Sequence, residues 1–114
     1  MPRDILDSVQ GTLDFLILKA LSFGTMHGYG VARWIFDRSG EELEIEEGTL
    51  YPALHRLEER GWVEAEWGLS ENNRRAKFYR LTRAGTRELT ARAKNWTRFT
   101  TAVERIIEAA ADGP

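Results

Sequence analysis

The last third of the chain repeats mainly apolar residues at alternating intervals of four and three, which places them along one face of a long helix. Thr82 is a suitable N-cap, and the pattern continues to about residue 111. A helix of about 28 residues is on the order of 40 Å long, more than the rest of so small a domain could cover. One alternative is that the whole stripe packs on its own domain. The length of the helix instead favours a homodimer, in which a second chain covers part of the stripe. It consists of Leu89, Ala93, Trp96, Thr100, Val103, Ile107 and Ala110, with Phe99 and Ile106 beside them.

Two shorter helices are predicted at the start of the chain, where apolar residues lie three and four positions apart. Thr12 is placed to cap the first helix, which ends near Gly24. The second helix follows a break at residues 23–26 and ends before Ser39 and Gly40. The apolar positions are Leu13, Leu16, Ile17, Ala20 and Leu21 in the first helix and Tyr29, Ala32, Trp34, Ile35 and Phe36 in the second.

A third helix is predicted after Gly48, with Thr49 as its cap and Gly61 as its stop signal. Pro52 then falls in the first turn, where a residue without an N–H group loses no intrahelical hydrogen bond. The proline therefore supports this boundary. The positions expected to face the core are Leu50, Leu54 and Leu57.

The segment after the third helix has the alternation of a β-hairpin. Residues 62–67 read as a strand, residues 68–75 as a polar loop and residues 76–81 as a second, aromatic-rich strand. Three helices, a hairpin and a further helix follow one another in this order in a winged helix-turn-helix. We therefore expect a mainly α fold with a small β-hairpin. Residues 1–82 would form the winged helix-turn-helix DNA-binding domain and residues 83–114 the C-terminal dimerisation helix.

Size and residue content limit the classes of protein to which the chain can belong. Its 114 residues suffice for one domain, and the lack of cysteine excludes disulfides and thiolate metal sites, as suits the cytoplasm. The longest apolar run, residues 15–18, is too short to cross a bilayer, and no signal peptide is expected. With His27 and His55 as the only histidines, we expect no metal and no cofactor.

An enzyme is not expected. The sequence contains no nucleophile elbow, no metal-ligand pair and no phosphate-binding loop. Gly28 and Gly30 are not followed by the third glycine of a dinucleotide-binding fingerprint.

Charge is distributed unevenly along the chain. The formal net charge of −2 by itself argues against binding nucleic acid. However, the run from Arg74 to Arg83 is basic and contains no acid, while five glutamates crowd residues 41–47 and would repel non-specific DNA. Such a basic run is either a solvated surface or a binding surface. Its position on the hairpin favours phosphate contact by Arg74, Arg75 and Lys77.

The outer side of the third helix supplies candidates for contact with DNA bases. Arg56 can pair with guanine or with a phosphate, and Pro52 offers an apolar contact to a thymine methyl group. The Tyr51 hydroxyl group can donate a hydrogen bond to a phosphate, or the side chain can simply be packed at the domain edge. The full set of candidates is Thr49, Tyr51, Pro52, His55 and Arg56. The sequence thus indicates a sequence-specific DNA-binding regulator; the alternative is a winged-helix module whose basic wing docks on an acidic protein.

Four segments resemble the PadR-like family of transcriptional regulators, in particular its short members with a single C-terminal helix. They are residues 16–21, 27–30, 48–58 and 74–82, with the sequences LILKAL, HGYG, GTLYPALHRLE and RRAKFYRLT. The resemblance covers nearly the whole chain, and several motifs in order are more specific than any one of them. It implies a homodimeric winged-helix repressor, often of its own gene and of neighbouring transport, detoxification or stress genes. A two-fold dimer would bind a near-palindromic operator in double-stranded DNA.

The resemblance also implies roles for particular residues. The family's DNA contacts correspond here to Thr49, Tyr51, Pro52, His55 and Arg56 and to the wing residues Arg74, Arg75 and Lys77. In some short members a tryptophan of the last helix stacks flat aromatic compounds against its symmetry mate, and Trp96 stands at the matching position. Trp96 is therefore expected to anchor the dimer interface. It serves either as an anchor alone or as an anchor that is also a platform for a small aromatic effector. Its expected neighbours there are Ala93, Phe99, Thr100 and Val103.

Overall fold

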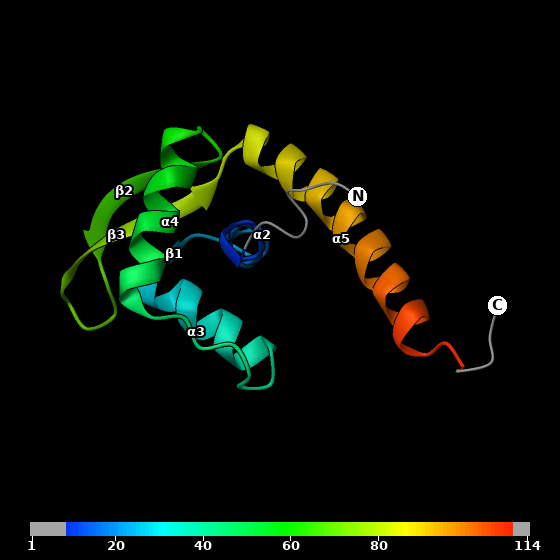
Figure 1. Cartoon of the computed structure of the whole chain (residues 1–114). Coiled ribbons are helices and arrows are strands. Elements are labelled where there is room, and N and C mark those ends of the chain that lie inside the picture. Colours follow the sequence, from blue (N-terminus) through cyan, green and yellow to red (C-terminus); the bar gives the residue numbers. More distant parts are fainter. Residues whose placement is uncertain (1–8, 111–114) are drawn as a thin grey trace.

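The computed structural model describes residues 9–110, which form four helices and three strands (Figure 1). In chain order the elements are helix α2 (Val9–Leu21), strand β1 (Met26–His27), helix α3 (Gly28–Arg38), helix α4 (Glu47–Glu59), strand β2 (Val63–Leu69), strand β3 (Arg75–Leu81) and helix α5 (Arg83–Ile107).

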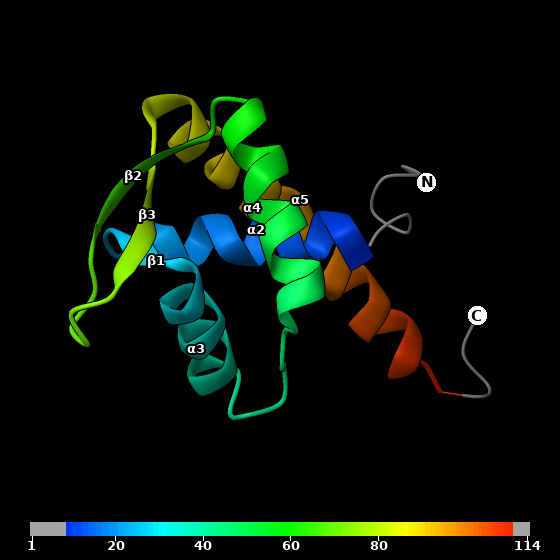
Figure 2. The ribbon, with the colours of Figure 1, turned by 90° about the vertical axis from the view of Figure 1, so that its left-hand side faces the viewer.

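One apolar core joins the helices α2, α3 and α4 to the sheet. Helix α4 crosses α2, and the sheet lies at one end of this pair (Figure 2). The three leucines predicted to face inward from the third helix are all buried. The largest fully buried side chains are Ile17, Leu18, Val31, Leu50, Leu54, Leu57 and Val63. The core therefore holds α4 in place while leaving its other side exposed.

Helix α2 begins earlier than the sequence pattern predicts. Thr12 was the expected cap, but the helix already includes Val9 and continues to Leu21. Its beginning lies beside α5, where Arg92 donates a hydrogen bond to the carbonyl oxygen of Gly11 over 3.2 Å. This tertiary contact supports the helix upstream of its apolar repeat, and a local cap signal cannot reveal it.

The predicted boundary of α4 is wrong at its start and confirmed at its end. The helix begins at Glu47, so Pro52 lies in the second turn and Gly48 lacks an intrahelical N–H donor for its carbonyl oxygen. Gly48 is exposed, and water can satisfy that oxygen. At the other end Gly61 has a φ of 76° and donates to the carbonyl oxygen of Glu58 over 3.0 Å. This geometry is the left-handed helix end that glycine favours.

The hairpin is confirmed, but the sheet has a third strand. The strands are ordered β1-β3-β2 and both pairs are antiparallel. Strand β1 pairs Met26 with Tyr79 and His27 with Phe78, and its two residues are too few to produce a recognisable alternation. Strands β2 and β3 pair as far as Leu69 opposite Arg75, which shortens the predicted loop to residues 70–74.

Helix α5 follows the predicted cap. The Thr82 hydroxyl oxygen accepts a hydrogen bond from the Gly85 N–H over 3.0 Å. The helix runs for 25 residues and ends at Ile107, four residues before the predicted end, which lies outside the described residues. Its C-terminal half extends away from the domain (Figure 1). The chain is thus a mainly α winged helix-turn-helix with a long C-terminal helix.

Candidate nucleic-acid interface

The outer side of α4 presents most of the predicted base-reading side chains to solvent. Thr49, Tyr51, Pro52 and His55 are all exposed. Tyr51 is also held from the side, because a Cβ atom at Gly28 would lie only 2.7 Å from its ring. Helix α3 therefore begins with a residue small enough to let this aromatic ring lie against it. The Tyr51 ring is thus packed at the domain edge, one of the two alternatives left open by the sequence, while part of the residue stays exposed. Its contact with DNA stays a prediction.

His55 faces an acid on the same helix. Its Nε2 atom lies 3.8 Å from Oε2 of Glu59, and both side chains are exposed. Glu59 occupies the outermost side of α4 together with His55, so the reading surface combines a carboxylate with an imidazole. The carboxylate is an acceptor, which can take a hydrogen bond from an amino group of cytosine.

Arg56 is oriented differently from the expectation of a freely outward side chain. Its Nη2 atom lies 3.0 Å from Oδ1 of Asp14 on helix α2. The Arg56 side chain is 28% exposed, while the Asp14 side chain is 7% exposed. The sequence pattern places Arg56 on the outer side of the helix and cannot identify its partner 42 residues away.

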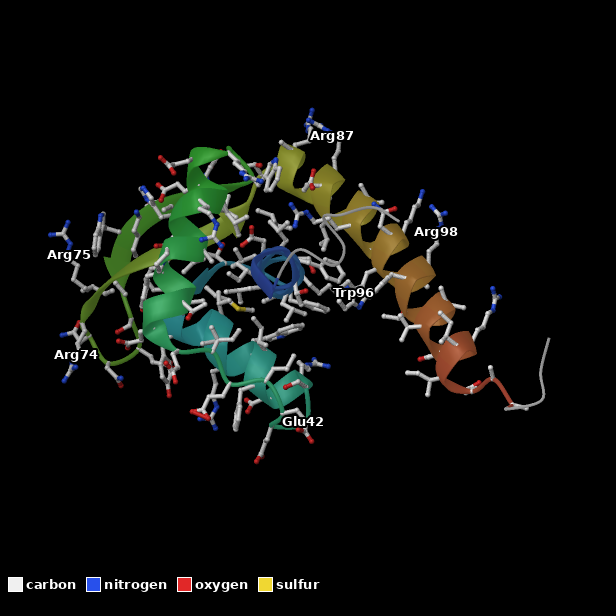
Figure 3. The ribbon with its side chains drawn as sticks, viewed as in Figure 1. Glu42, Arg74, Arg75, Arg87, Trp96 and Arg98 are labelled. Atoms are coloured by element: carbon white, nitrogen blue, oxygen red, sulfur yellow. The ribbon has the colours of Figure 1, made fainter. Side chains whose placement is uncertain are left out.

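The wing presents Arg74 and Arg75 at its far end, pointing away from the body of the molecule (Figure 3). Both are exposed, and neither forms an ion pair with any of residues 9–110. The guanidinium carbon of Arg75 lies 4.8 Å from the centroid of the Trp67 ring. Stacking on the indole restricts the arginine without neutralising its charge.

Lys77 does not share the free position of the two arginines. Its Nζ atom lies 3.0 Å from Oε1 of Glu58 on α4, and both side chains are half-buried. The hydrogen bond to Glu58 raises the pKa of Lys77 above its ordinary value of 10.5. Lys77 therefore joins the wing to α4. Unlike Arg74 and Arg75, it is not presented away from the acids.

Among the described residues, three exposed aromatic side chains were not among the predicted site residues: Phe23, Tyr29 and Trp67. Trp67 on β2 is 56% exposed, although its alternation with Val63 and Ala65 predicts a core-facing position. The hairpin extends beyond the core at this point, so the same face of the strand is buried at Val63 and open at Trp67. Tyr29 in the first turn of α3 is likewise exposed. Their neighbours in the sequence carry no signal that would distinguish them from core aromatics.

A shallow hollow of about 440 Å³ lies on the outer face of the hairpin. Arg80 forms its polar side and lies 2.6 Å from Oε2 of Glu64. Phe78 forms its apolar side and contacts the position of Gly68, where a Cβ atom would be 3.3 Å from the ring. The hollow is thus lined by groups that already pair with one another. In residues 9–110 no three acidic or histidine side chains gather as metal ligands.

Trp96 lies between α5 and α2 (Figure 3). Its ring centroid is 6.1 Å from that of Phe15 and 5.9 Å from that of Phe99. The other predicted neighbours, Ala93, Thr100 and Val103, are half-buried. Further along the helix Ile106 and Ile107 are 75% and 74% exposed. The apolar stripe is therefore covered by its own domain at its start and open to solvent at its end.

Comparison with known proteins identifies relatives of the whole chain. The chain matches the family described as transcriptional regulator PadR-like over residues 17–91, more than half of its length. It is similar to the structure of the Clostridium thermocellum transcriptional regulator Cth-833, with 28% identity and a TM-score of 0.78, over 88% of this chain and 97% of that one. A PadR family transcriptional regulator from Eggerthella lenta DSM 2243 has 30% identity and a TM-score of 0.75, over 93% and 90% of the two chains.

A further relative also aligns over nearly the full length of both proteins. The uncharacterized protein X of Lysinibacillus sphaericus is 29% identical over 102 residues, which are 90% of this chain and 94% of that protein. No helix among the described residues is long and apolar enough to span a membrane. The family match includes α3, α4, the hairpin and the start of α5, and therefore contains all the candidate DNA contacts on α4 and the hairpin. The chain belongs to the PadR-like family of transcriptional regulators.

Proposed function

We propose that this protein is a sequence-specific DNA-binding repressor that acts as a homodimer. The observation that carries the proposal is that α4 and the wing lie on the same side of the molecule. Arg74 and Arg75 point outward on that side in Figure 3. In Figure 2, where this side faces the viewer, α4 lies in front of α2. A DNA duplex on that side would meet polar groups suited to base edges and cations suited to phosphates at once.

The reading helix would enter the major groove. There the hydroxyl groups of Thr49 and Tyr51 donate hydrogen bonds to phosphates, while Pro52 and His55 face the base edges. Arg56 keeps its predicted DNA contact through the N–H groups that Asp14 leaves free. Because acids surround this helix, we expect it to contribute specificity more than affinity.

The wing would contact the phosphate backbone or the minor groove. Arg74 and Arg75 supply the unpaired charge, and the guanidinium of Arg75 lies over the Trp67 ring at the end of the hairpin. Lys77 contributes through the N–H groups not bonded to Glu58. The wing is therefore the main electrostatic anchor of the proposed complex.

The dimer would form along the C-terminal helix. Two exposed isoleucines near the end of α5, Ile106 and Ile107, continue the stripe that α2 covers only in part. A second copy on this stripe would remove them from water and would relate the two reading helices by a two-fold axis. Residues 1–82 then form the DNA-binding domain and residues 83–114 the dimerisation helix, and the operator is near-palindromic with half-sites about one DNA turn apart.

A small aromatic compound would relieve repression at this interface. Trp96 supports this part of the proposal, because it lies next to Phe15 and Phe99 on the stripe and offers a flat ring for stacking. A ligand that bound one spacing of the two subunits better than the other would change the fit to the operator. Flat aromatic compounds should quench tryptophan emission in the wild type but much less in Trp96→Leu, and should weaken operator binding. Quenching without any change in operator affinity would contradict the relief of repression.

DNA selected from a random library by the purified protein provides the test of the proposal. Fluorescence anisotropy on the selected duplex and on a scrambled duplex, at several salt concentrations, should give at least ~1000-fold preference for the selected one. Arg74→Ala/Arg75→Ala should weaken binding to both duplexes and make the slope of log K against log salt less negative by about 2, because each lost phosphate contact means that about one counterion fewer is released. Arg33→Ala is the control, since this arginine lies on α3 and is paired with Asp37. Equal, weak binding to both duplexes would favour the protein-docking module.

A further inference from the structure

Helix α2 carries a buried acid that the proposed DNA contacts do not use. Asp14 is the single polar or charged residue that is buried in the described part of the chain. A carboxylate removed from water is costly unless a cation or several donors compensate it. The presence of an acid at this buried position is therefore explained by the group with which it pairs.

What Asp14 holds is an arginine of the reading helix. The Arg56 Nη2 atom donates to Oδ1 of Asp14 over 3.0 Å, and Arg56 is the one cation in ion-pair distance of that acid within residues 9–110. A guanidinium group has five N–H bonds in one rigid plane. A bond from one edge of this plane to Asp14 sets the direction of the remaining N–H groups. Arg56 is still partly exposed, so part of the group stays accessible.

The carboxylate itself has a fixed position. Next to Asp14 in the chain, Phe15 packs against Trp96 of α5. One turn earlier, the carbonyl oxygen of Gly11 accepts a hydrogen bond from Arg92, whose guanidinium is in turn paired with Glu88. Helix α5 thus holds α2 on one side while α4 crosses it on another (Figure 2). A rigid support is what a group that orients a second side chain requires.

We propose that Asp14 is a positioning residue for Arg56, which it holds in the direction required for contact with the operator. The inference rests on the proposed function and deepens it. A free arginine would lose much rotamer freedom on binding DNA, whereas one already bonded to a buried carboxylate has lost part of it beforehand. Asp14 therefore contributes to the discrimination between operator and other DNA, although its negative charge lies behind the binding surface.

The competing role of Asp14 is simple neutralisation of Arg56. Under that role, removal of the carboxylate would free a cation and strengthen binding to every duplex alike. Under the positioning role, removal would strengthen or leave unchanged the binding to scrambled DNA and weaken the binding to the operator. The ratio of operator affinity to scrambled-DNA affinity separates these two roles. A smaller fraction of folded protein would weaken the binding to both duplexes alike, so it would not produce the pattern expected for the positioning role.

The test uses the full chain with Asp14→Asn, which keeps the shape of the side chain and removes its charge. Glu104→Gln is the matched control, because it makes the same change of charge at an exposed acid of α5 that forms no ion pair within residues 9–110. We expect the ratio of operator to scrambled affinity to fall about tenfold in Asp14→Asn, as for one lost oriented contact, and to stay at the wild-type value in the control. Equal strengthening on both duplexes, or an unchanged ratio, would overturn the inference.

A mutant cycle tests whether the effect passes through Arg56. In an Arg56→Met background, Asp14→Asn should cause no further loss of the ratio. Should Asp14→Asn fail to fold, Arg56→Lys provides the second variant, since it retains the charge and the acid but lacks the planar fork. The ratio should fall in this variant as well, and a wild-type ratio would overturn the inference.

A measurement without DNA keeps failure of this inference distinct from failure of the proposed function. The Arg56 Nη2–H signal in the NMR spectrum of the free protein should be sharp and slowly exchanging in the wild type and in Glu104→Gln. It should be averaged in Asp14→Asn. An averaged signal in the wild type would overturn the inference whatever the DNA result, whereas a protein that binds all duplexes equally would overturn the proposed function.

Discussion

At the scale of single residues, the charges around the reading helix are mostly engaged with one another. His55 faces Glu59, Arg56 is bonded to Asp14, and the two arginines at the tip of the wing form no ion pair within residues 9–110. On the proposed DNA-binding surface this division would separate two tasks, because oriented groups discriminate between bases and free cations attract phosphates. A small protein with net negative charge can thereby keep its non-specific binding low.

Lys77 gives a pH-dependent prediction at this scale. Its bond to Glu58 raises its pKa, so the folded state holds the proton more tightly than the unfolded state, and the stabilisation is present below about pH 10.5. It is lost as the pH rises through the higher folded pKa. We expect Lys77→Met to lower the free energy of unfolding by about 0.5–1 kcal/mol at pH 7, a value limited by solvent screening. At pH 11 and above, urea unfolding should show a smaller difference from wild type.

Tyr79 also titrates at alkaline pH. Burial raises the pKa of Tyr79 and the neighbouring charge of Lys77 lowers it, so Lys77→Met changes this titration as well. The same substitution is therefore compared in a Tyr79→Phe background, where the tyrosine does not contribute. A penalty for Lys77→Met that stays constant from pH 7 to pH 11 would contradict a role for the ion pair and indicate lost packing of the lysine chain instead.

At the scale of elements, the junction of α5 with the sheet depends on a close approach of two backbones. A Cβ atom at Gly85 would lie 2.0 Å from the carbonyl oxygen of Trp62 and 3.0 Å from Leu81. The same junction is tied by Thr82, whose hydroxyl group donates to the carbonyl oxygen of Gly61. Helix α5 therefore leaves the domain in one direction, which matters for where a second copy would meet it.

We expect Gly85→Ala to lower the free energy of unfolding by about 1–3 kcal/mol, because the carbonyl oxygen in its way belongs to backbone and cannot turn aside. The matched control is Gly48→Ala in α4, where a Cβ atom would meet nothing within 4 Å. There the helix should be unchanged or stabilised by roughly 0.5–1 kcal/mol. Urea unfolding followed by circular dichroism measures both, and equal effects of the two substitutions would rule out the steric explanation.

At the scale of the whole molecule, the protein is elongated, with extents of 61 × 29 × 23 Å. The long dimension includes the C-terminal half of α5, which projects from the domain with Ile106 and Ile107 exposed (Figure 1). An apolar helix end in water is unfavourable in a monomer, since its burial is worth about 25 cal/mol for each Å² removed from water. The shape of the protomer thus supports the proposed dimer.

The dimer is tested by placing a charge in the exposed end of the stripe. Ile106→Asp/Ile107→Asp should shift the protein from dimer to monomer in sedimentation equilibrium, because the charges would be buried without partners. Operator affinity should fall at least ~100-fold, as the two half-sites would no longer be bound together. Leu43→Asp is the control, because it places a charge at an exposed apolar residue outside α5 and should leave the dimer intact. A wild-type protein that sediments as a monomer at micromolar concentration would refute the proposed assembly.

The winged-helix order was predictable because each of its elements has a strong local signal. Three-four periodicity identified the helices, alternation identified the hairpin, and Thr82 and Gly61 marked helix boundaries that the structure confirms. The boundaries that were wrong had tertiary causes. Helix α2 begins upstream of Thr12 beside α5, and the short strand β1 exists only because β3 offers it a partner.

The sequence by itself determined which residues are buried in the third helix, where the hairpin turns back and that the last helix exceeds its domain. These are consequences of periodicity and local backbone preference, which act between residues close in the chain. Tertiary structure alone decided that Arg56 bonds Asp14, that Lys77 bonds Glu58 and that Trp67 is open to solvent. Charge pairs and exposure depend on elements distant in sequence, because the desolvation of a charge is set by everything packed around it.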